Sequence, residues 1–492
     1  MGTRRFDPWV IAAVVAGLAL RLVNLGAAPF WLDEMYTFEM LRVPWDALLG
    51  AAMRDNQAPA YYALAKGWTA IGGWSPAALR VPGLLASLAC IPLAAAVTRL
   101  VAGRRAARMA AWVAALSPFL IQHAQDARPY ALLAAVATAN LLLLVRFLVR
   151  RSPRLGFWWA ASAFAVVATH YYGIFFLAGQ GLALLILRPE PVRSWLPAGI
   201  VTGASCGALV LAAVGRASGD FGASYVFGIT AIPGVVWSLL TGYTLMPTSE
   251  DLHAFGGTRA ALPYLPVALA TLPAFALVAA EGLRTMRREG RVLLLASFTV
   301  ALSAPFAYRL AAGVGVHPRY FAAAIAPTLV VIGAGMVFDR SARGLATVVV
   351  LVVLSAATFL HLRDTAHGRE DLRAAGRWLD TNVPFDEEIL VTSAEMEVLA
   401  RFTWPDRKFR RYPASGGLID PARVPELVAA FPVAGRARAI FLVGRAWVTD
   451  RDGALQAALA GAYPSCPGVE VRGIRILCFQ PRSTATVAAA DR

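Results

Sequence analysis

The chain has 492 residues, of which 58% are hydrophobic and 15% are charged, and its mean hydropathy is +0.58. Ordinary soluble domains are about half apolar and roughly a quarter charged, so this composition excludes a soluble protein. A net charge of +16 would suggest a nucleic-acid partner in a soluble chain. Here the arginines lie between apolar stretches, and no nucleic acid is expected.

The apolar residues gather into stretches long enough for a helix to cross about 30 Å of hydrocarbon. The first stretch follows Arg4 and Arg5, as the core of a signal peptide would. We interpret it as an uncleaved span, because many spans follow and the residues just after it carry candidate chemistry. The sequence predicts an all-α polytopic membrane protein with eleven spans, at residues 9–24, 77–98, 107–122, 129–148, 156–169, 171–187, 194–214, 262–283, 291–311, 319–338 and 343–361.

Arginine-rich connections between these spans all fall on the side of the N-terminus. By the positive-inside rule that side is cytoplasmic. Inserting or deleting one span would move later arginines to the wrong face, so the agreement supports the assignment. The weakest part is residues 156–187, where His170 and two tyrosines separate two short spans that could instead form one bent or re-entrant pair.

Residues 1–361 form the predicted transmembrane catalytic domain. Two of its outer segments, residues 25–76 and 215–261, are long enough to fold. The first contains two predicted amphipathic helices, at residues 35–52 and 61–72, which are suited to the membrane interface.

The chain becomes polar after residue 361 and remains so for about 130 residues, the size of a small domain. An extracytoplasmic α/β domain is predicted over residues 362–481, and the small polar residues 482–492 are expected to be disordered. Helical stretches at residues 370–380, 421–431 and 452–460 alternate with strand-like runs at residues 388–392, 439–443 and 469–479.

The chain has four cysteines, none in a CxxC or other metal-binding pattern. Cys90 and Cys206 lie in apolar segments, whereas Cys466 and Cys478 flank the last predicted strand. A disulfide between the latter two suits the oxidising side of a membrane. Two unpaired thiols that pack as small hydrophobes fit the sequence equally well.

Polar and ionisable residues gather at the outer ends of the spans, whereas the cytoplasmic connections hold mostly arginine. Such groups are costly in a membrane and tend to line a cavity or path. The candidate residues are Arg21, Asp33, Glu34, Tyr61, Tyr62, His123, Asp126, Arg128, Tyr130, His170, Tyr171, Tyr172, His317, Arg319 and Tyr320.

Each candidate also has a simpler interpretation. Asp33 is suited to capping a helix, the arginines to reaching lipid headgroups, and the histidines to structural hydrogen bonds. Convergence of all three kinds on one membrane face favours a binding site. Asp33, Asp126 and His170 could hold a divalent metal, but their spacing does not require one, and the sequence requires no cofactor.

The sequence contains neither GxxxxGK[ST] nor GxGxxG, the loops that bind nucleotide phosphates. We therefore expect a substrate that is already activated on the outer side.

Four stretches carry a family resemblance. The segment from Arg21 to Glu34 resembles the start of GT-C fold glycosyltransferases of the protein mannosyltransferase and aminoarabinose transferase type (glycosyltransferase family 39). In that family an Asp-Glu pair opens the first outer loop. Residues 59–62, 124–130 and 169–173 resemble later stretches of the same family in the same order, so the resemblance covers roughly residues 15–340.

This chain departs from the family pattern at two places. Gln57-Ala58-Pro59 stands where the family often has His-Pro-Pro, which removes a histidine contact to the donor or a metal. Asp126 stands where the family often has Glu, which shortens an acid without removing it.

The resemblance implies an inverting hexosyl- or pentosyltransferase of the bacterial cytoplasmic (inner) membrane. Its donor would be a polyprenyl-phosphate sugar, and its acceptor a glycan, lipid or protein on the periplasmic or extracellular face. A lipid-linked sugar transporter or flippase is the alternative. It would not need a general base, and the sequence lacks the internal repeats expected of a transporter.

The chemistry of sugar transfer from a lipid phosphate indicates a role for several of these residues. Lipid phosphate is already a good leaving group, so transfer needs one carboxylate to take the acceptor proton and cations to stabilise the phosphate. Asp33 is the expected base, with Glu34 and Asp126 as further catalytic candidates. Arg128 and Arg319 are the expected phosphate binders. The predicted donor- or substrate-binding set is completed by Arg21, Tyr61, Tyr62, Tyr130, His170, Tyr171, Tyr172, His317 and Tyr320.

Overall fold

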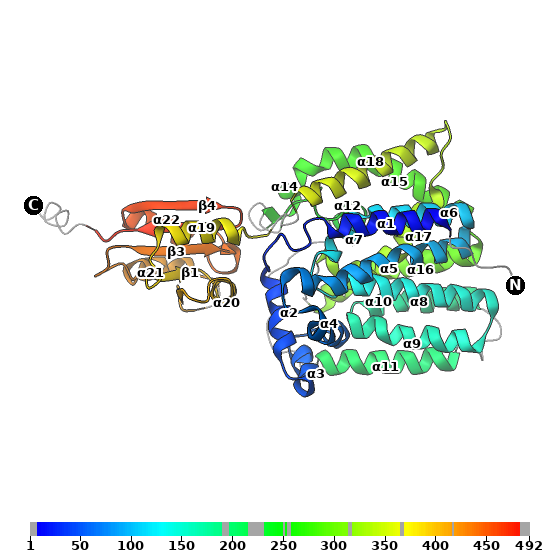
Figure 1. The fold of residues 1–492 in the computed structure, drawn as a ribbon, viewed down its shortest axis with the longest axis horizontal. Coiled ribbons are helices and arrows are strands. Elements are labelled where there is room, and N and C mark those ends of the chain that lie inside the picture. The colour runs from blue at the N-terminus through cyan, green and yellow to red at the C-terminus, as the bar shows by residue number, and fades with distance from the viewer. Residues whose placement is uncertain are drawn as a thin grey trace, which may run out of the picture. The chain divides into compact units, whose positions relative to one another are not determined.

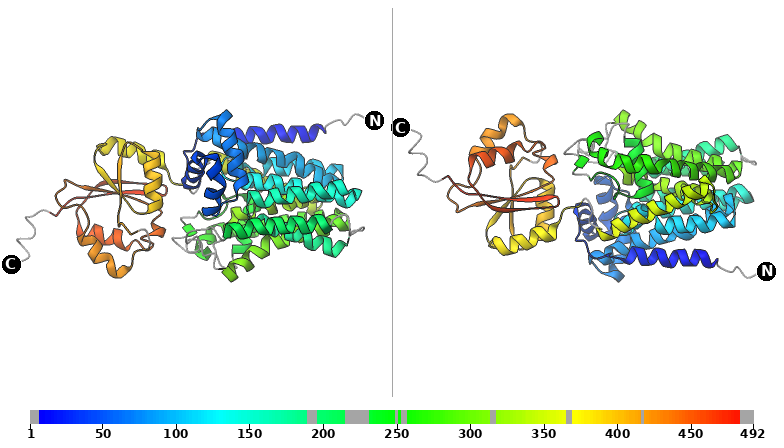
Figure 2. Two further views of the ribbon diagram at one scale, coloured as in Figure 1. Left: turned by 90° about the horizontal axis from the view of Figure 1, so that it is seen from below. Right: turned by 90° about the horizontal axis from the view of Figure 1, so that it is seen from above.

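The computed structural model describes residues 7–188, 196–214, 231–248, 251–252, 257–312, 317–364, 369–415 and 418–482. The chain divides into two compact units, which Figures 1 and 2 show as a helix bundle and a sheet with its helices. The helical unit is Met1–Ala28, Tyr36–Met246 and Ala261–Thr365. The sheet unit is Pro29–Met35, Pro247–Ala260 and Ala366–Arg492. The predicted disordered tail lies, except for Arg482, outside the described residues.

The chain is helical up to residue 363. Its elements there are α1 (Pro8–Leu22), α2 (Leu32–Arg42), α3 (Trp45–Arg54), α4 (Pro59–Gly72), α5 (Pro76–Ala102), α6 (Arg104–Leu116), α7 (Pro118–Ala124), α8 (Tyr130–Arg150), α9 (Pro153–Thr169), α10 (Gly173–Leu187), α11 (Leu196–Val214), α12 (Ala231–Thr241), α14 (Gly257–Ala261), η2 (Leu262–Tyr264), α15 (Leu265–Thr285), α16 (Arg288–Ala312), η3 (Pro318–Ala324), α17 (Ile325–Gly335) and α18 (Ala342–Arg363).

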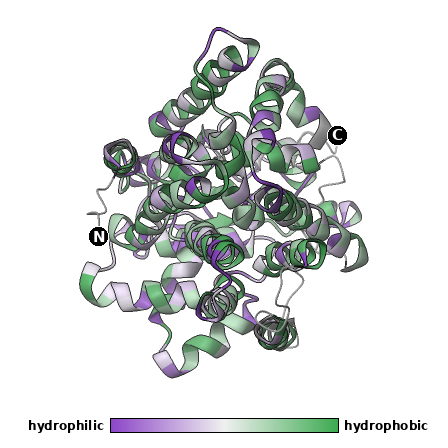
Figure 3. Cartoon of the chain, turned by 90° about the vertical axis from the view of Figure 1, so that its right-hand side faces the viewer, coloured by the Kyte–Doolittle hydropathy of each residue, from purple (hydrophilic) through white to green (hydrophobic). Residues whose placement is uncertain are grey.

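Each predicted span coincides with helix in the structure. In the described part of the chain, six helical stretches are long and apolar enough to cross a membrane: Pro76–Ala102, Tyr130–Arg150, Arg259–Thr285, Arg288–Ala311, Pro318–Gly335 and Ala342–Arg363. Shorter apolar helices accompany them, and Figure 3 shows hydrophobic residues along the bundle. The chain is therefore a multi-pass membrane protein. The number of eleven crossings remains a prediction.

Small residues let neighbouring helices approach closely. A Cβ added to Gly179 on α10 would lie 2.5 Å from the Ala296 carbonyl oxygen of α16. Close packing of this kind drives helix association in lipid, where burial from water cannot. The Phe175 and Tyr308 rings of these helices, 6.2 Å apart, place the start of α10 beside the end of α16.

The outer segment after α1 differs from the prediction in one respect. The expected single helix at residues 35–52 is two helices, α2 and α3, because Pro44 interrupts the helical hydrogen bonds and begins α3. Lys66 of α4 donates hydrogen bonds to the Leu41 and Val43 carbonyl oxygens, at 2.7 and 2.6 Å. An ammonium group at the last carbonyls of a helix satisfies them and fixes α4 against α2.

The sheet unit is a three-layer α/β structure. Its mixed sheet has the order β2-β1-β3-β5-β4, in which β2, β1 and β3 are parallel and β5 and β4 are antiparallel to their neighbours. The elements are α19 (Leu372–Asn382), β1 (Glu388–Val391), α20 (Ala394–Thr403), β2 (Lys408–Arg411), η4 (Pro421–Arg423), α21 (Val424–Ala429), β3 (Ala439–Gly444), η5 (Ala446–Val448), α22 (Ala454–Ala462), β4 (Ser465–Val471) and β5 (Ile474–Phe479).

Both faces of this sheet are buried by helices. Ile440 and Leu442 of β3 join the core formed with α19 and α20, whereas Phe441 and Val443 join the core formed with α22. This alternation follows from the period of two in a strand. The predicted α/β domain is thus confirmed, and so are its three helices.

Two predictions for this unit were incomplete. The single strand expected at residues 469–479 is instead the end of β4, a turn and β5. Arg472 and Gly473 turn the chain there, and Gly473 takes a φ of 71°. Helix α20 and strand β2 were not predicted. Cys466 and Cys478 form a disulfide across the hairpin.

The sheet unit also includes part of the first outer segment. Leu32 and Met35, 3% and 1% exposed, belong to the same hydrophobic core as Leu372 and Ile474. The Phe30 and Phe402 rings lie 6.0 Å apart. The segment Pro29–Met35 is therefore built into the fold of the C-terminal half of the chain.

Candidate active site

A loop between α7 and α8 carries the motif residues Asp126 and Arg128. Asp126 is 3% and Arg128 is 6% exposed. The Arg128 guanidinium donates hydrogen bonds to the hydroxyl oxygens of Tyr62, at 3.1 Å, and Thr37, at 3.2 Å. A guanidinium forms strong, charge-assisted hydrogen bonds with anions such as phosphate.

Gln57, the residue that departs from the family pattern, extends this network. The Tyr62 hydroxyl donates to Gln57 Oε1 at 3.1 Å, and the Tyr171 hydroxyl donates to the Gln57 carbonyl oxygen at 3.0 Å. The Tyr61 ring packs edge-on against Tyr62 with centroids 5.5 Å apart. These contacts join the outer segment to the turn after α9.

A cluster of rings lies where the start of α8, the turn between α9 and α10, and η3 meet. Tyr320 lies 5.5 Å from the His170 ring, 5.2 Å from Tyr172 and 6.4 Å from Tyr130, centroid to centroid. The Arg319 guanidinium carbon lies 5.6 Å from the Tyr130 ring centroid. The cation is suited to pairing with a phosphate group. The aromatic faces beside it are suited to stacking on a sugar ring.

The cluster extends through His123 and His317 to Tyr243. The His123 ring lies 5.1 Å from Tyr130 and 5.8 Å from Tyr243, and Tyr243 lies 5.9 Å from His317. His123 Nδ1 is 3.9 Å from the Asp126 carboxylate. Tyr243 was missing from the predicted site, because only its place after α12, which was not predicted, brings it here.

Two histidines of the cluster are held in their neutral form. Burial, together with the positive charges of Arg128 and Arg319, lowers the pKa of His170 to about 3. Burial also holds the pKa of His317 well below its usual value. Nδ1 of each ring accepts a backbone N–H, from Tyr172 and Arg319 respectively, so the proton is on Nε2. Each ring can donate a hydrogen bond without carrying charge.

Asp33 and Glu34 lie in the first turn of α2, in the portion that belongs to the sheet unit. The Met35 amide donates to the Trp31 carbonyl oxygen at 2.9 Å, so the helical bonds begin at Trp31. Asp33 is inside the helix and is not its N-cap, and the capping interpretation is wrong. A carboxylate in this first turn is still favoured by the helix dipole.

Arg21 is not one of the residues that the ring cluster brings together. Its guanidinium, 0% exposed, donates to Ser87 Oγ at 2.8 Å and to the carbonyl oxygens of Gly17, Ala114 and Ala115 at 2.9 to 3.1 Å. These bonds tie α1 to α5 and α6. The side chain satisfies buried carbonyls, which is a structural role.

The metal site suggested for Asp33, Asp126 and His170 remains a prediction. No group of three or more histidine, cysteine, aspartate or glutamate side chains among the described residues is arranged to hold a metal ion. A bound zinc ion usually needs at least three protein ligands.

No protein-family model matches the chain, and no curated protein sequence matches it. Solved structures do match it. ArnT from Cupriavidus metallidurans in the apo state is 12% identical over 96% of this chain and 98% of its own, with a TM-score of 0.53. The same protein bound to undecaprenyl phosphate is 14% identical over the same shares, with a TM-score of 0.50.

A third structure is the oligosaccharyltransferase AglB from Archaeoglobus fulgidus in complex with an inhibitory peptide and a dolichol-phosphate. It is 13% identical over 97% of this chain and 74% of its own, with a TM-score of 0.50. Both neighbours are GT-C glycosyltransferases. Likeness at this level of identity establishes architecture, and the chain has the GT-C fold.

Proposed function

We propose that the chain is an inverting glycosyltransferase that moves a monosaccharide from a polyprenyl-phosphate donor to an acceptor on the outer face of a bacterial cytoplasmic membrane. The observation that carries the proposal is the buried Arg128, held by Tyr62 and Thr37 beside the ring cluster of a membrane-embedded GT-C fold. The complexes of the two neighbours with undecaprenyl phosphate and dolichol-phosphate give additional support.

The donor phosphate is assigned to Arg128 and Arg319. Each guanidinium can donate to a phosphate oxygen, and burial strengthens such a bond because water does not compete. Both charges act on His170, which they help to keep neutral, so the two arginines face a common region. The neutral Nε2–H of His170 adds a donor for a sugar hydroxyl or phosphate oxygen.

The acceptor proton is assigned to Asp33. In this mechanism the acceptor oxygen attacks the anomeric carbon, its proton passes to the Asp33 carboxylate, and polyprenyl phosphate leaves with the electron pair of the broken C–O bond. Asp33 and Thr37 are four residues apart on α2, so they lie on one face of that helix. Thr37 is one of the two residues that accept a hydrogen bond from Arg128.

The experiment is to incubate the purified chain with a panel of polyprenyl-phosphate sugars and to follow them by mass spectrometry. Donor hydrolysis or transfer of one sugar is the expected result. A flippase would bind the same lipids and leave the C–O bond intact. Intact donor in every reaction, with lipid movement across vesicles, would replace the transferase proposal with transport.

A further inference from the structure

Gln125 begins the loop between α7 and α8 (residues 125–129, the α7–α8 loop) and is hydrogen-bonded to two other helices. The residue is 4% exposed. Its Nε2 donates to the carbonyl oxygens of Arg21, at 3.2 Å, and Val23, at 2.6 Å, at the end of α1. Its Oε1 lies 2.9 Å from Nε2 of His361, in the last turn of α18. The α7–α8 loop is thereby joined to α1 and to α18.

The chemistry of the amide fixes the direction of the contact with His361. An amide nitrogen donates hydrogen bonds and an amide oxygen accepts them. Because Gln125 Nε2 faces two carbonyl oxygens, turning the amide over would place oxygen against oxygen. Oε1 therefore faces His361, and the hydrogen of this bond is on His361 Nε2. His361 is 2% exposed, so its removal would leave the buried Gln125 oxygen without this donor.

The α7–α8 loop passes the position of Gln125 on to Arg128. The Arg128 amide donates to the Asp126 carbonyl oxygen at 2.8 Å, which makes a tight turn directly after Gln125. A Cβ added to Gly83 of α5 would lie 3.1 Å from the same oxygen, so the turn lies closely against α5. From this turn the Arg128 side chain reaches the Tyr62 hydroxyl. A displacement of Gln125 therefore moves the Arg128 guanidinium, and small displacements of binding groups are costly.

Further hydrogen bonds hold the end of α18. Asn24 Nδ2 donates to the Leu362 carbonyl oxygen at 2.9 Å. Thr358 Oγ1 donates to the carbonyl oxygen of Leu116, at the end of α6, also at 2.9 Å. Hydrogen bonds between helices help to fix their positions in lipid. The His361 bond differs from these two because it ends on the α7–α8 loop.

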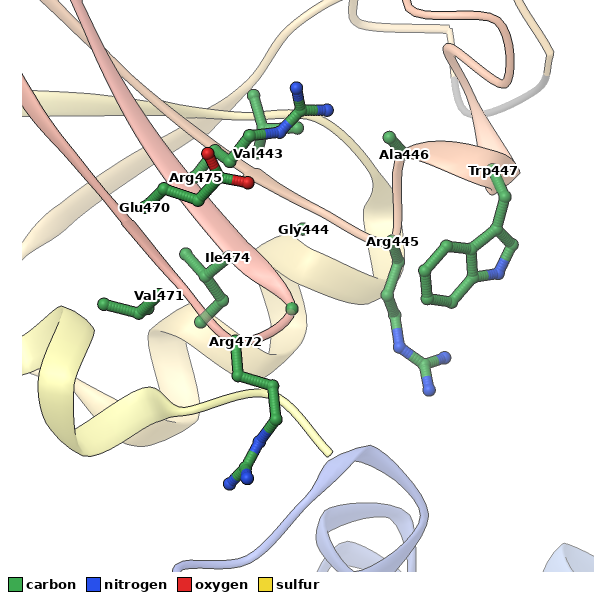
Figure 4. A pocket seen from close by; sticks show the side chains of 11 residues that line it. Val443, Gly444, Arg445, Ala446, Trp447, Glu470, Val471, Arg472, Ile474 and Arg475 are labelled. Carbon is green, nitrogen blue, oxygen red and sulfur yellow. The ribbon is translucent and has the colours of Figure 1, made fainter. Parts of the chain in front are cut away.

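The arginines of a pocket in the sheet unit are matched by nearby carboxylates. Figure 4 shows this pocket of about 370 Å³, where the β4–β5 hairpin turn meets the end of β3. Arg445 is paired with Glu370 at 2.7 Å, and Arg475 is the direct partner of Glu470 across the hairpin. We therefore expect changes in this pocket to leave the binding of a lipid phosphate unaltered. Trp447, which also lines it, supplies a control outside the helical unit.

We propose that His361 is a positioning residue for the donor phosphate: its hydrogen bond to Gln125 holds the α7–α8 loop so that the Arg128 guanidinium meets the phosphate of the lipid. The inference rests on the part of the proposed function in which Arg128 binds that phosphate. His361 lies outside the four stretches that carry the family resemblance, and its contact with Gln125 connects it to the site. A purely structural His361 would stabilise α18 without affecting phosphate binding.

The test is a titration of full-length variants in detergent with polyprenyl phosphate, and the unfolding temperature of each variant is measured alongside. His361→Met and His361→Gln have side chains of similar shape, but only glutamine keeps an N–H for Gln125. His361→Met should raise the Kd about tenfold, because a buried acceptor loses its donor. His361→Gln should restore the Kd to within about twofold of the parental value.

Thr358→Val is the control for a general loosening of α18. It removes a hydrogen bond of the same helix and should lower the unfolding temperature, while its Kd and that of Trp447→Ala should stay within about twofold of the parental value. A double-mutant cycle tests the route through Gln125. Adding His361→Met to Gln125→Met should weaken binding no further, because the bond between the two residues is already absent.

The inference is overturned if folded His361→Met binds like Thr358→Val, or if the effects of Gln125→Met and His361→Met add. Should His361→Met not fold, His361→Gln still decides, because a folded chain that keeps the N–H but loses binding contradicts the proposal. A parental chain that does not bind polyprenyl phosphate overturns the proposed function together with this inference. Parental binding without hydrolysis or transfer of a lipid-linked sugar overturns the proposed catalysis and leaves the role of His361 in place.

Discussion

Asp33 makes a sharp test at the scale of one residue, because α2 begins before it and excludes a capping role. Asp33→Asn keeps the shape of the side chain but cannot take a proton. Loss of the favourable charge–dipole interaction should cost at most about 1 kcal/mol of folding free energy. Transfer should fall by roughly a hundredfold or more, the usual worth of a positioned base. Rates of transfer and thermal unfolding are measured together.

Asp46→Asn is the matched control for this variant. Asp46 is also in the first turn of a helix of the outer segment, α3, and it is exposed. It should transfer sugar at the parental rate. Parental transfer by Asp33→Asn would exclude Asp33 as the base and direct attention to Glu34 and Asp126.

Arg128 and Arg319 should affect donor binding. Arg128→Ala and Arg319→Ala each remove a charge-assisted contact, worth about 1.5–3 kcal/mol, so donor dissociation constants should rise by about tenfold to a hundredfold. The measurement is a titration with polyprenyl phosphate. Arg150→Ala, at the exposed end of α8, is the control and should bind normally. If both variants bind like Arg150→Ala, these arginines serve only to meet lipid headgroups.

His170 makes a prediction about pH. Its pKa is about 3 in the folded chain and near 6.5 when unfolded, so below pH 6.5 the unfolded chain binds more protons. Stability from this residue is complete above pH 6.5 and is lost as pH falls towards 3. The unfolding temperature should therefore drop between pH 7 and pH 5, and His170→Gln should reduce that drop. An identical drop in both proteins would assign it to other groups.

Many residues of the candidate site could be predicted from short motifs, since Arg128, Tyr130, His170 and Tyr172 occur in recognisable stretches. The contacts between them were not. Thr37 and Tyr62 meet Arg128 across 91 and 66 residues of sequence, and no local pattern encodes such pairs. Arg21 shows the converse: it lies in a motif, yet its hydrogen bonds are to buried carbonyls.

At the scale of elements, apolar length predicted the helices because a bilayer imposes a minimum length on every span. Predictions failed where a single residue changes the path. Pro44 divides α2 from α3, and Gly473 folds one expected strand into a hairpin. Strand β2, Lys-Phe-Arg-Arg, was missed because an edge strand with charged residues lacks an apolar pattern.

The disulfide of the β4–β5 hairpin should contribute measurably to the stability of the sheet unit. Cys466 and Cys478 are 12 residues apart, and closing a loop of that length is worth about 3 kcal/mol in the chain-entropy account. The double variant Cys466→Ser, Cys478→Ser should unfold at a lower urea concentration, with a free energy of unfolding lower by about 3 kcal/mol. Reductant should shift the parental chain equally and leave the double variant unchanged. A shift of the double variant by reductant would exclude this disulfide as the cause.

At the scale of the whole molecule, the GT-C fold followed from the order of the spans and the four motif stretches. The membership of Pro29–Met35 in the sheet unit did not, because Leu32 and Met35 pack with residues more than 300 positions away. From the sequence alone, apolar residues in a short outer loop could equally well lie at the membrane interface. Only the packing shows that they complete the core of the C-terminal half.

This packing makes the membrane topology testable. Residues that pack in one core cannot be separated by about 30 Å of hydrocarbon, so residues 369–482 must share the membrane face of Asp33. The arginine-rich connections, such as Arg150 and Arg151 after α8, should face the cytoplasm. In intact cells a membrane-impermeant maleimide should label Asp406→Cys, an exposed position before β2, without treatment. Arg151→Cys, the exposed control, should be labelled only after the cells are permeabilised. Protection of Asp406→Cys, or labelling of Arg151→Cys in intact cells, would reverse the proposed orientation and place Asp33 on the cytoplasmic side.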